Sequence, residues 1–279
     1  MTSYRHSRAT RTPRVAVVAH RGHWDAAPEN SLAAIVAAAE AGCTVAEIDI
    51  RRTADGALVL MHDASCRRTT GHDLAPAAAT LAELSALPLL ARDGGPGAAP
   101  TAQTVPTLAA ALAVARGRIF LDLDLKDLSL APEVIAAVRA AGAEDRVDLK
   151  ARVETAEDCR RLAALQAESG IAMMAMARFT AATCAARLDA LAAAPPFMVE
   201  ASFDDADLLP AICARLNRLG TAVWVNTLDC AHDCGLSDSA ALADPDAVWG
   251  RLVRAGVSAI QTDAAPRLLA WLAHQEVPA

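Results

Sequence analysis

The sequence predicts a (β/α)8 barrel, the TIM-barrel fold, with a small insertion after its second strand. Apolar runs alternate with helical patterns along almost the whole chain, which is typical of a parallel sheet wrapped by helices. The 279 residues, 54% of them hydrophobic, suffice for one large core, and such a barrel needs about 250 residues. We therefore expect a single domain over residues 1–279. The predicted strands are Val15–His20, Thr44–Ile50, Ile119–Asp124, Val147–Lys150, Ile171–Met176, Phe197–Ala201, Ala222–Asn226 and Ser258–Thr262.

A helix is predicted directly after the first strand. Asn30 or Ser31 could cap its first turn, and Gly42 could end it. Four apolar residues recur at i, i+3, i+4 and i+7, the spacing of one helix face: Leu32, Ile35, Val36 and Ala39. Later helices follow the same plan, for instance Ala156–Glu168, Asp207–Leu219 and Ala247–Ala255.

Residues 63–106 break this rhythm, because the segment is too long for an ordinary βα loop and is rich in Pro, Gly, Ala and Thr near its end. We expect an insertion that forms a rim or lid over the pocket. A loosely ordered excursion without substrate contact is the open alternative.

The N-terminal residues 1–13 are arginine-rich, and the apolar run Val15–Ala19 that follows them is shorter than a signal peptide needs. We expect a disordered tail there.

The charge and composition of the chain indicate what kind of molecule it binds. A net charge of −7 and a pI near 5.5 argue against a nucleic-acid or anionic-membrane surface, since both need a basic footprint. No apolar run approaches the roughly 20 residues of a membrane span. The expected partner is a small molecule.

The seven cysteines favour a reducing compartment, because an odd number spread over a chain of this size does not suggest a disulfide framework. We therefore expect a cytoplasmic protein. The loop from Cys230 to Cys234 superficially resembles half of a zinc site. It lacks a second ligand pair elsewhere, so a loop that holds two thiols is the preferred interpretation.

Two carboxylates lie on one face of the second predicted strand. Glu47 and Asp49 are two residues apart, so their side chains point the same way while Ile48 and Ile50 point the other way. Two buried carboxylates need a compensating charge, because an unpaired buried charge costs several kcal/mol. Oxygen ligands favour one divalent cation, Mg²⁺ or Ca²⁺ with Mn²⁺ as a further candidate, over zinc. Two acids on an exposed edge strand are the alternative.

The third predicted strand also alternates, with Asp122, Asp124 and Lys126 on one face and leucines on the other. A barrel strand is normally buried on both faces, so this pattern is unexpected unless the polar face opens into a site. Other strand ends carry weaker candidates, each of which could equally be structural: Lys150, Glu200, Trp224, Asn226 and Asp263. Trp224 could line a substrate pocket, although a tryptophan at a strand end is more often simply packed.

Several linked motifs resemble those of the glycerophosphodiester phosphodiesterase family. They occur in the family's order along nearly the whole chain: His20-Arg21-Gly22, Pro28-Glu29-Asn30-Ser31, Glu47-x-Asp49, Asp55-Gly56, Leu58 to Asp63, Arg68-Thr69-Thr70-Gly71, Val105 to Leu108, Asp124-x-Lys126 and Gln261-Thr262-Asp263. The resemblance implies a TIM-barrel hydrolase that uses a divalent metal. It also implies that the segment after the second strand is the family's small insertion.

The resemblance assigns roles to individual residues. It implies that Asp124 is the third metal ligand beside Glu47 and Asp49, although the family usually has Glu at this place; Asp122 is the fallback. Arg21 and Lys126 would contact the phosphate. The two histidines would share acid and base duty, namely His20 and His62.

The implied reaction is hydrolysis of a glycerophosphodiester to a phosphomonoester, similar to glycerol 3-phosphate, and an alcohol. In this family the nucleophile can be a neighbouring hydroxyl of the substrate, which gives a cyclic phosphate that water then opens. One rival is a phospholipase D-like enzyme acting on a lysophospholipid or sphingolipid, because the related sphingomyelinase D group tends to have Asp at the position of Asp124. The other rival is a non-catalytic phosphodiester-binding barrel, which is disfavoured because every motif position is occupied.

Overall fold

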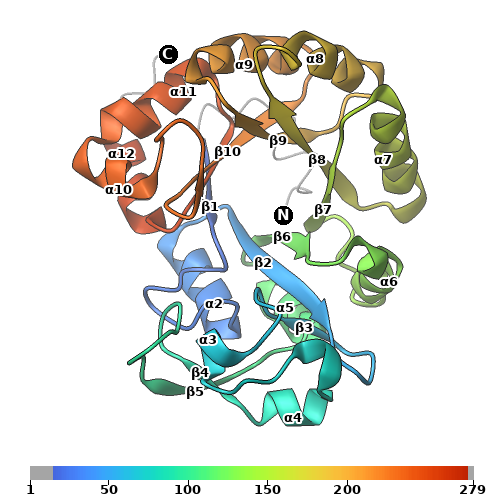
Figure 1. Cartoon of the computed structure of the whole chain (residues 1–279), viewed down its shortest axis with the longest axis vertical. Coiled ribbons are helices and arrows are strands. Elements are labelled where there is room, and N and C mark those ends of the chain that lie inside the picture. The colour runs from blue at the N-terminus through green and yellow to red at the C-terminus, as the bar shows by residue number, and fades with distance from the viewer. Residues whose placement is uncertain (1–14, 276–279) are drawn as a thin grey trace. The chain divides into compact units, whose positions relative to one another are not determined.

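The computed structural model describes residues 15–275, so the predicted tail of residues 1–13 lies outside the described residues. Contacts divide the chain into two compact units (Figure 1). We call Ala19–Val147 the N-terminal unit, and we call Asp148–Ala279 together with Met1–Val18 the C-terminal unit. Each unit is described by itself.

The N-terminal unit is built on three paired strands. β2 (Val45–Arg52) pairs in parallel with β6 (Phe120–Leu125), and β3 (Leu58–Leu60) pairs with β2 in the antiparallel direction. The first six residues of β2 are buried. The longer helices of this unit are α2 (Leu32–Ala41), α5 (Leu108–Ala115) and α6 (Ala131–Ala140). The 3₁₀ turn η2 (Leu128–Leu130) directly precedes α6.

Helix α2 begins and ends as the sequence predicts. The Ser31 hydroxyl accepts a hydrogen bond from the Ala34 N–H at 3.0 Å, which caps the first turn. Gly42 ends the helix with a φ of 93°, a left-handed conformation that glycine adopts without steric cost. Of the two predicted caps, Ser31 is therefore the one that caps α2.

The insertion between β3 and α5 has a hydrophobic core of its own. This core is formed by buried residues from several short elements, among them Met61, Cys66, Leu84 and Leu89. The elements are α3 (Arg67–Thr70), η1 (Pro76–Ala78), α4 (Leu81–Ser85) and the antiparallel pair β4 (Pro88–Leu90) and β5 (Pro100–Thr104). The segment is therefore packed rather than loosely ordered, while its role as a lid stays a prediction.

The C-terminal unit contains a run of strands in the order β7-β8-β9-β10-β12-β1. The pairings of β7 with β8, β8 with β9, β9 with β10 and β10 with β12 are parallel. The strands are β1 (Ala16–Ala19), β7 (Val147–Arg152), β8 (Ala172–Phe179), β9 (Met198–Phe203), β10 (Ala222–Leu228) and β12 (Ala259–Thr262), and the short β11 (Ala231–His232) pairs antiparallel with β10.

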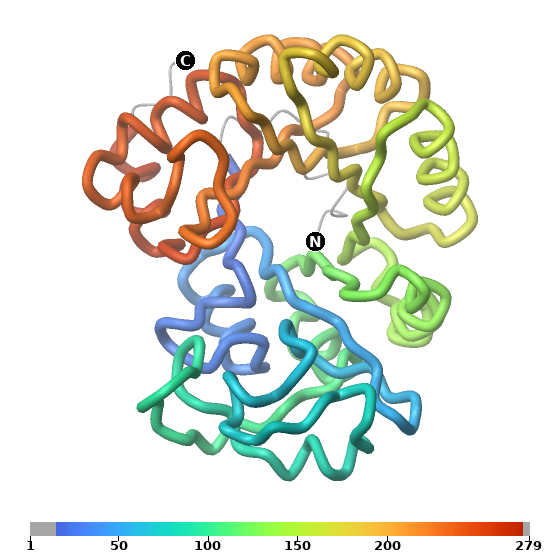
Figure 2. Tube along the Cα trace, in the orientation of Figure 1, coloured from blue at the N-terminus to red at the C-terminus, as the bar shows by residue number. Residues whose placement is uncertain are grey.

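Helices separate these strands along the chain, and Figure 2 lets the alternation be followed by colour. They are α7 (Ala156–Ser169), α8 (Cys184–Ala193), η3 (Ala206–Leu208), α9 (Leu209–Arg218), α10 (Asp238–Ala243), a wider turn at Asp246–Gly250, α11 (Arg251–Ala255) and α12 (Ala265–His274). The chain thus has the (β/α)8 fold that the sequence predicts, with the insertion after its second barrel strand. No helix among residues 15–275 is both long and apolar enough to cross a membrane.

The predicted strands are all present, but six of them extend further at their carboxyl ends. β8, for example, runs on to Phe179, and Arg178 still pairs with Ser202 of β9. Backbone pairing does not require an apolar side chain, so a prediction based on apolar runs ends too early. The helix predicted from Asp207 is instead a 3₁₀ turn followed by α9.

Candidate active site

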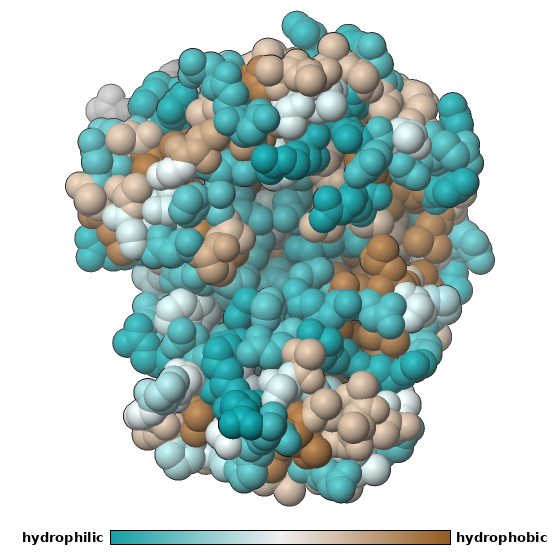
Figure 3. Space-filling view, in the orientation of Figure 1, coloured by the Kyte–Doolittle hydropathy of each residue, from teal (hydrophilic) through white to brown (hydrophobic). Residues whose placement is uncertain are grey.

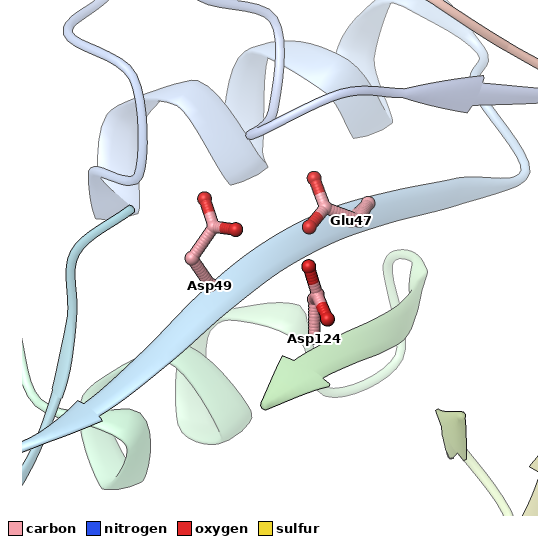
Figure 4. A group of neighbouring side chains, drawn as sticks. All are labelled: Glu47, Asp49 and Asp124. Carbon is pink, nitrogen blue, oxygen red and sulfur yellow. The ribbon is translucent and has the colours of Figure 1, made fainter. Parts of the chain in front are cut away.

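Three carboxylates come together in the N-terminal unit. Glu47 and Asp49 project from the same side of β2, and Asp124 projects from β6 (Figure 4). One carboxylate oxygen from each lies within 4.8 Å of the others. Glu47 and Asp49 are only 2% and 1% exposed, so these two like charges are held together away from water. A donor set of three carboxylates at this separation could hold a metal ion.

The strand register explains which acid of β6 joins the pair. Asp49 lies beside Asp124 in the parallel pairing of β2 and β6, and Glu47 lies beside Asp122. Among the described residues, it is Asp124 that forms the potential metal-binding group with Glu47 and Asp49. The geometry therefore supports Asp124 over the fallback Asp122, and its role as a ligand stays a prediction.

Backbone turns hold the two buried carboxylates from outside their strand. The Arg21 N–H donates to Glu47 Oε2 at 3.0 Å. Asn30 contacts Asp49 twice, because its Nδ2 donates to Asp49 Oδ2 at 2.7 Å and its Oδ1 accepts from the Asp49 N–H at 3.0 Å. Arg21 and Asn30 both have positive φ, 55° and 53°, and such strained backbone is often found at functional sites.

Two cations compensate part of this negative charge. Lys126 Nζ lies 2.7 Å from Asp49 Oδ1 and 2.6 Å from Asp124 Oδ2, and Arg21 Nε lies 3.5 Å from Asp49 Oδ2. Burial by itself would raise the pKa of Asp49, but Lys126 and Arg21 outweigh it and hold that pKa well below its usual range. Burial likewise lowers the pKa of Lys126, yet Asp49 and Asp124 raise it on balance. Asp49 and Lys126 are therefore both charged near neutral pH.

His62 is oriented by the residue that follows it. Its Nδ1 lies 2.7 Å from Asp63 Oδ1, and its carbonyl oxygen accepts hydrogen bonds from Arg51 Nε and Nη2 at 3.0 and 2.6 Å. Burial would raise the pKa of Asp63, but hydrogen bonds from Arg68 and His62 lower it to about 2. A charged Asp63 favours a proton on Nδ1, which makes Nε2 the ring nitrogen suited to proton transfer.

Arg68 of the insertion links the two histidine-containing motifs. Its Nη1 and Nη2 donate to Glu29 Oε2 and Oε1, both at 2.7 Å, and its Nε donates to Asp63 Oδ2 at 2.8 Å. Glu29 is 2% exposed and also accepts from Arg21 Nη1 at 3.1 Å. The result is a continuous ionic network from Arg21 through Glu29 and Arg68 to Asp63, and thus to the ring of His62.

His20 begins the turn that presents Arg21, directly after β1, and it is 8% exposed. Glycine follows because this turn is crowded: Gly22 has a φ of 78°, and an added Cβ would come within 2.8 Å of the Ala34 backbone. The catalytic role of His20 stays a prediction, as does that of His62.

The structure adds positioning residues to which the sequence assigned no role in the site: Glu29, Asn30, Asp63 and Arg68. Their signal in the sequence was their place inside the same short motifs as the predicted ligands and histidines. The spacing of residues in the sequence could not predict which side chains they contact, since Arg68 and Glu29, for example, are 39 positions apart.

Trp224 lies in the C-terminal unit and is fully buried. Its Nε1 donates to Asn226 Oδ1 at 2.7 Å, while Asn226 Nδ2 donates to Glu200 Oε1 at 2.9 Å. Lys150 Nζ lies 3.3 Å from the other oxygen of Glu200. Trp224 therefore orients Asn226 in this structure, and its predicted substrate contact stays a prediction. The Cys230–Cys234 loop belongs to no potential metal-binding group among the described residues.

Comparisons with curated proteins point to one family. Glycerophosphodiester phosphodiesterase 1 of Rattus norvegicus is 56% identical over 57 residues, which are 20% of this chain and 17% of the rat protein. A glycerophosphodiester phosphodiesterase of Caldanaerobacter subterraneus subsp. tengcongensis is 46% identical over 54 residues, 19% of this chain and 22% of that protein. The matched segments thus span only about a fifth of each relative.

Solved structures extend the likeness to almost the whole chain. A phosphodiesterase of Oleispira antarctica, in complex with the product sn-glycerol-3-phosphate, is 26% identical, with a TM-score of 0.65 over 91% of this chain and 95% of that one. In these segments and in its fold, the chain is similar to glycerophosphodiester phosphodiesterases. A glycerophosphoryl diester phosphodiesterase of Parabacteroides distasonis, 20% identical, shares the family's fold, with a TM-score of 0.76 over 98% of this chain and 93% of that one. A family model described as a domain of unknown function matches residues 173–272.

Proposed function

We propose that this protein hydrolyses a glycerophosphodiester to a phosphomonoester and an alcohol with the help of one divalent cation. The observation that carries the proposal is the group formed by Glu47, Asp49 and Asp124, with Arg21 and Lys126 beside it. Support comes from the Oleispira antarctica relative, whose structure contains sn-glycerol-3-phosphate as product. The substrate is thus a small molecule.

The three carboxylates would hold the cation. Because all three donors are oxygens, Mg²⁺ and Ca²⁺ are the preferred ions and Mn²⁺ is possible. When bound, the cation would polarise the phosphoryl oxygens of the substrate. Asn30 and the Arg21 N–H contribute by fixing the carboxylates before the cation binds.

Arg21 and Lys126 would stabilise the negative charge that develops on the phosphoryl group. The planar guanidinium of Arg21 can donate two hydrogen bonds to phosphate oxygens, and the Lys126 ammonium supplies a point charge. Glu29 holds the Arg21 guanidinium, because Nη1 donates to its two carboxylate oxygens at 3.3 and 3.1 Å. Preorganised charge of this kind favours the transition state over the ground state.

His20 and His62 would transfer the protons. One histidine would remove the proton of the attacking water or neighbouring substrate hydroxyl, and the other would protonate the leaving alkoxide. If the substrate hydroxyl attacks, a water molecule then opens the cyclic phosphate to the phosphomonoester. For His62, Asp63 selects Nε2 as the reacting nitrogen by accepting the Nδ1 proton. Asp63 thus acts through His62 as a positioning residue.

The phospholipase D-like alternative needs an apolar channel or an interfacial surface. Among the described residues, Leu128 and Leu242 are the large hydrophobic side chains with substantial exposure, 58% and 46%. The face drawn in Figure 3 is mainly hydrophilic, with hydrophobic residues in small groups. These observations favour a diester dissolved in water over a lipid in a membrane as the substrate. We further propose a cytoplasmic location, because the cysteines are unpaired thiols.

A phosphate-ester panel tests the proposal. Metal-stripped protein is assayed for release of choline, ethanolamine, inositol or a sugar from the matching glycerophosphodiesters, before and after addition of Mg²⁺, Ca²⁺ or Mn²⁺. We expect no turnover in the stripped protein and recovery with at least one of the ions. Full activity without metal contradicts the role of the cation, and no hydrolysis of any diester contradicts the reaction.

A further inference from the structure

The connection between β4 and β5, residues 91–99, contacts the candidate active site through its backbone. The Arg92 carbonyl oxygen accepts a hydrogen bond from the Glu29 N–H at 2.8 Å. Glu29 is the buried acid whose carboxylate oxygens accept from both Arg21 and Arg68. The connection thus holds the main chain of the residue whose side chain holds Arg21.

The same connection also lies directly against Arg68. Arg68 Nη1 donates to the Asp93 carbonyl oxygen, and the Arg68 carbonyl oxygen accepts from the Gly95 N–H at 2.7 Å. Between these two bonds, Gly94 has a φ of 75°, and a Cβ added there would overlap the Arg68 carbonyl oxygen. Glycine permits both this φ and this close approach. The connection is therefore packed against the network of Glu29 and Arg68.

Arg92 has a backbone conformation that side chains rarely adopt. Its φ is 59°, in the left-handed region, and such a conformation persists in a non-glycine residue where the surroundings hold it. Two side chains of the β1–α2 loop do so. Arg92 Nη2 forms an ion pair with Asp25, and the guanidinium carbon of Arg92 lies 5.7 Å from the centroid of the Trp24 ring. We call this contact of three side chains the Arg92 clasp.

The clasp fits a role in orientation better than a role in stability. The side chains of Arg92 and Asp25 are 63% and 48% exposed, so water screens their attraction, and an exposed ion pair contributes little to the free energy of unfolding. What the clasp fixes is the direction of the Arg92 carbonyl group, which accepts from the N–H of the buried Glu29.

We propose that Arg92 is a positioning residue for hydrolysis of the phosphodiester. The clasp fixes the Arg92 carbonyl group, this group fixes Glu29, and Glu29 fixes the Arg21 guanidinium that stabilises the phosphoryl charge. Asp25 and Trp24 act through Arg92. The β4–β5 connection is thus a fixed rim of the site and not a closing lid. The proposal rests on the proposed function, because the role of Arg21 exists only in that reaction.

Amide hydrogen exchange of the full-length protein tests the clasp without any substrate. In Arg92→Gly the clasp is lost, but glycine adopts the left-handed backbone without strain, so the fold should survive. The Glu29 amide, followed by NMR, should then exchange about tenfold faster than in the parent, because its hydrogen bond opens more often. Arg92→Lys keeps a cation for Asp25 and the Trp24 ring, and should retain the protection of the parent. Unchanged protection of Glu29 in Arg92→Gly overturns the proposal, whatever the activity.

Steady-state kinetics with the best diester and added metal tests the positioning role. Arg92→Gly should lower kcat by about tenfold and leave KM within about twofold, because a misplaced Arg21 loses an interaction made mainly in the transition state. Arg92→Lys should restore most of the rate, and Asp25→Asn should lower it. Glu133→Gln is the matched control for Asp25→Asn, since Glu133 is 42% exposed and pairs with Arg52 outside the clasp.

The outcomes separate this proposal from the proposed function. A parent protein that hydrolyses no diester contradicts the reaction and, with it, the positioning role. An active parent together with an unchanged kcat in Arg92→Gly overturns the positioning role and leaves the reaction intact. Equal losses in Glu133→Gln and Asp25→Asn also overturn it, because any lost surface charge would then have the same effect.

Discussion

The two units arrange their buried polar side chains in opposite ways. In the N-terminal unit, Glu47, Asp49 and Asp124 bring three like charges together within 4.8 Å. In the C-terminal unit, the carboxylate of Glu200 lies between a cation, Lys150, and an amide, Asn226. Crowded like charges are stable only when an opposite charge is added, whereas a balanced cluster needs none. Lys126 and Arg21 compensate only part of the charge in the first unit, and we therefore propose that a metal cation completes the compensation there.

The largest effect expected from this contrast is at His62. His62→Ala removes one proton-transfer step, which typically costs about 100- to 10,000-fold in rate. His274→Ala is the control from the C-terminal unit, where this histidine is exposed at the end of α12. Steady-state turnover of the best diester measures both variants. Equal rates for His62→Ala and the parent protein would remove His62 from the chemistry.

A smaller but still large effect is expected at Arg21. Arg21→Lys keeps the charge but loses the planar fork that can bind two phosphate oxygens, so kcat/KM should fall by more than about tenfold. Arg215→Lys, on α9 of the other unit, should have no such effect. Thermal unfolding serves to show that both variants remain folded. If Arg21→Lys turns over like the parent, Arg21 is only structural.

One glycine with positive φ in each unit allows the stability of the two units to be compared. Gly170→Ala, at the end of α7, should cost about 1–2 kcal/mol, because only the left-handed backbone opposes it and no atom lies within 4 Å of the added Cβ. Gly22→Ala meets the same backbone cost and also the Ala34 backbone at 2.8 Å, so it should cost about 1–3 kcal/mol more. Chemical denaturation measures both. Equal losses would mean that the turn at Gly22 has room to relax.

The smallest effects are expected in the pH dependence of stability, with opposite signs in the two units. Asp63, whose pKa is lowered to about 2, stabilises the fold above the ordinary carboxyl pKa, and this contribution is lost as the pH falls towards 2. Burial raises the pKa of Asp238 to about 6, although Thr227 and Thr262 donate hydrogen bonds to it. Its stabilising contribution is therefore complete below the ordinary carboxyl pKa and is lost as the pH rises through 6.

Asparagine variants isolate these two contributions. Relative to the parent, Asp63→Asn should be least stable near neutral pH and should approach the parent in acid. The free energy of unfolding of Asp238→Asn, relative to that of the parent, should be highest above pH 6. The free energy of unfolding, measured by denaturant titration at several pH values, gives both trends. The same pH dependence for both variants would contradict the opposite environments of the two aspartates.

Local patterns in the sequence predicted what depends on neighbours along the chain. The alternation at Glu47 and Asp49 predicted their common face, and Ser31 and Gly42 predicted the ends of α2. Contacts between distant segments left no such pattern. The bidentate pairing of Arg68 with Glu29 and the pairing of β4 with β5 inside the insertion depend on how the chain folds back, so spacing alone could not predict them.

Calorimetric titration with Mn²⁺ or Mg²⁺ tests the central claim most directly. Asp124→Ala leaves two protein carboxylates from a single strand, so metal affinity should fall, and excess metal should partly rescue turnover. Glu200→Gln, the control from the balanced cluster, and His62→Ala should both bind metal like the parent. Unchanged affinity in Asp124→Ala would contradict the three-carboxylate site and would transfer the third ligand role to Asp122, while weaker binding in His62→Ala would make that histidine a ligand.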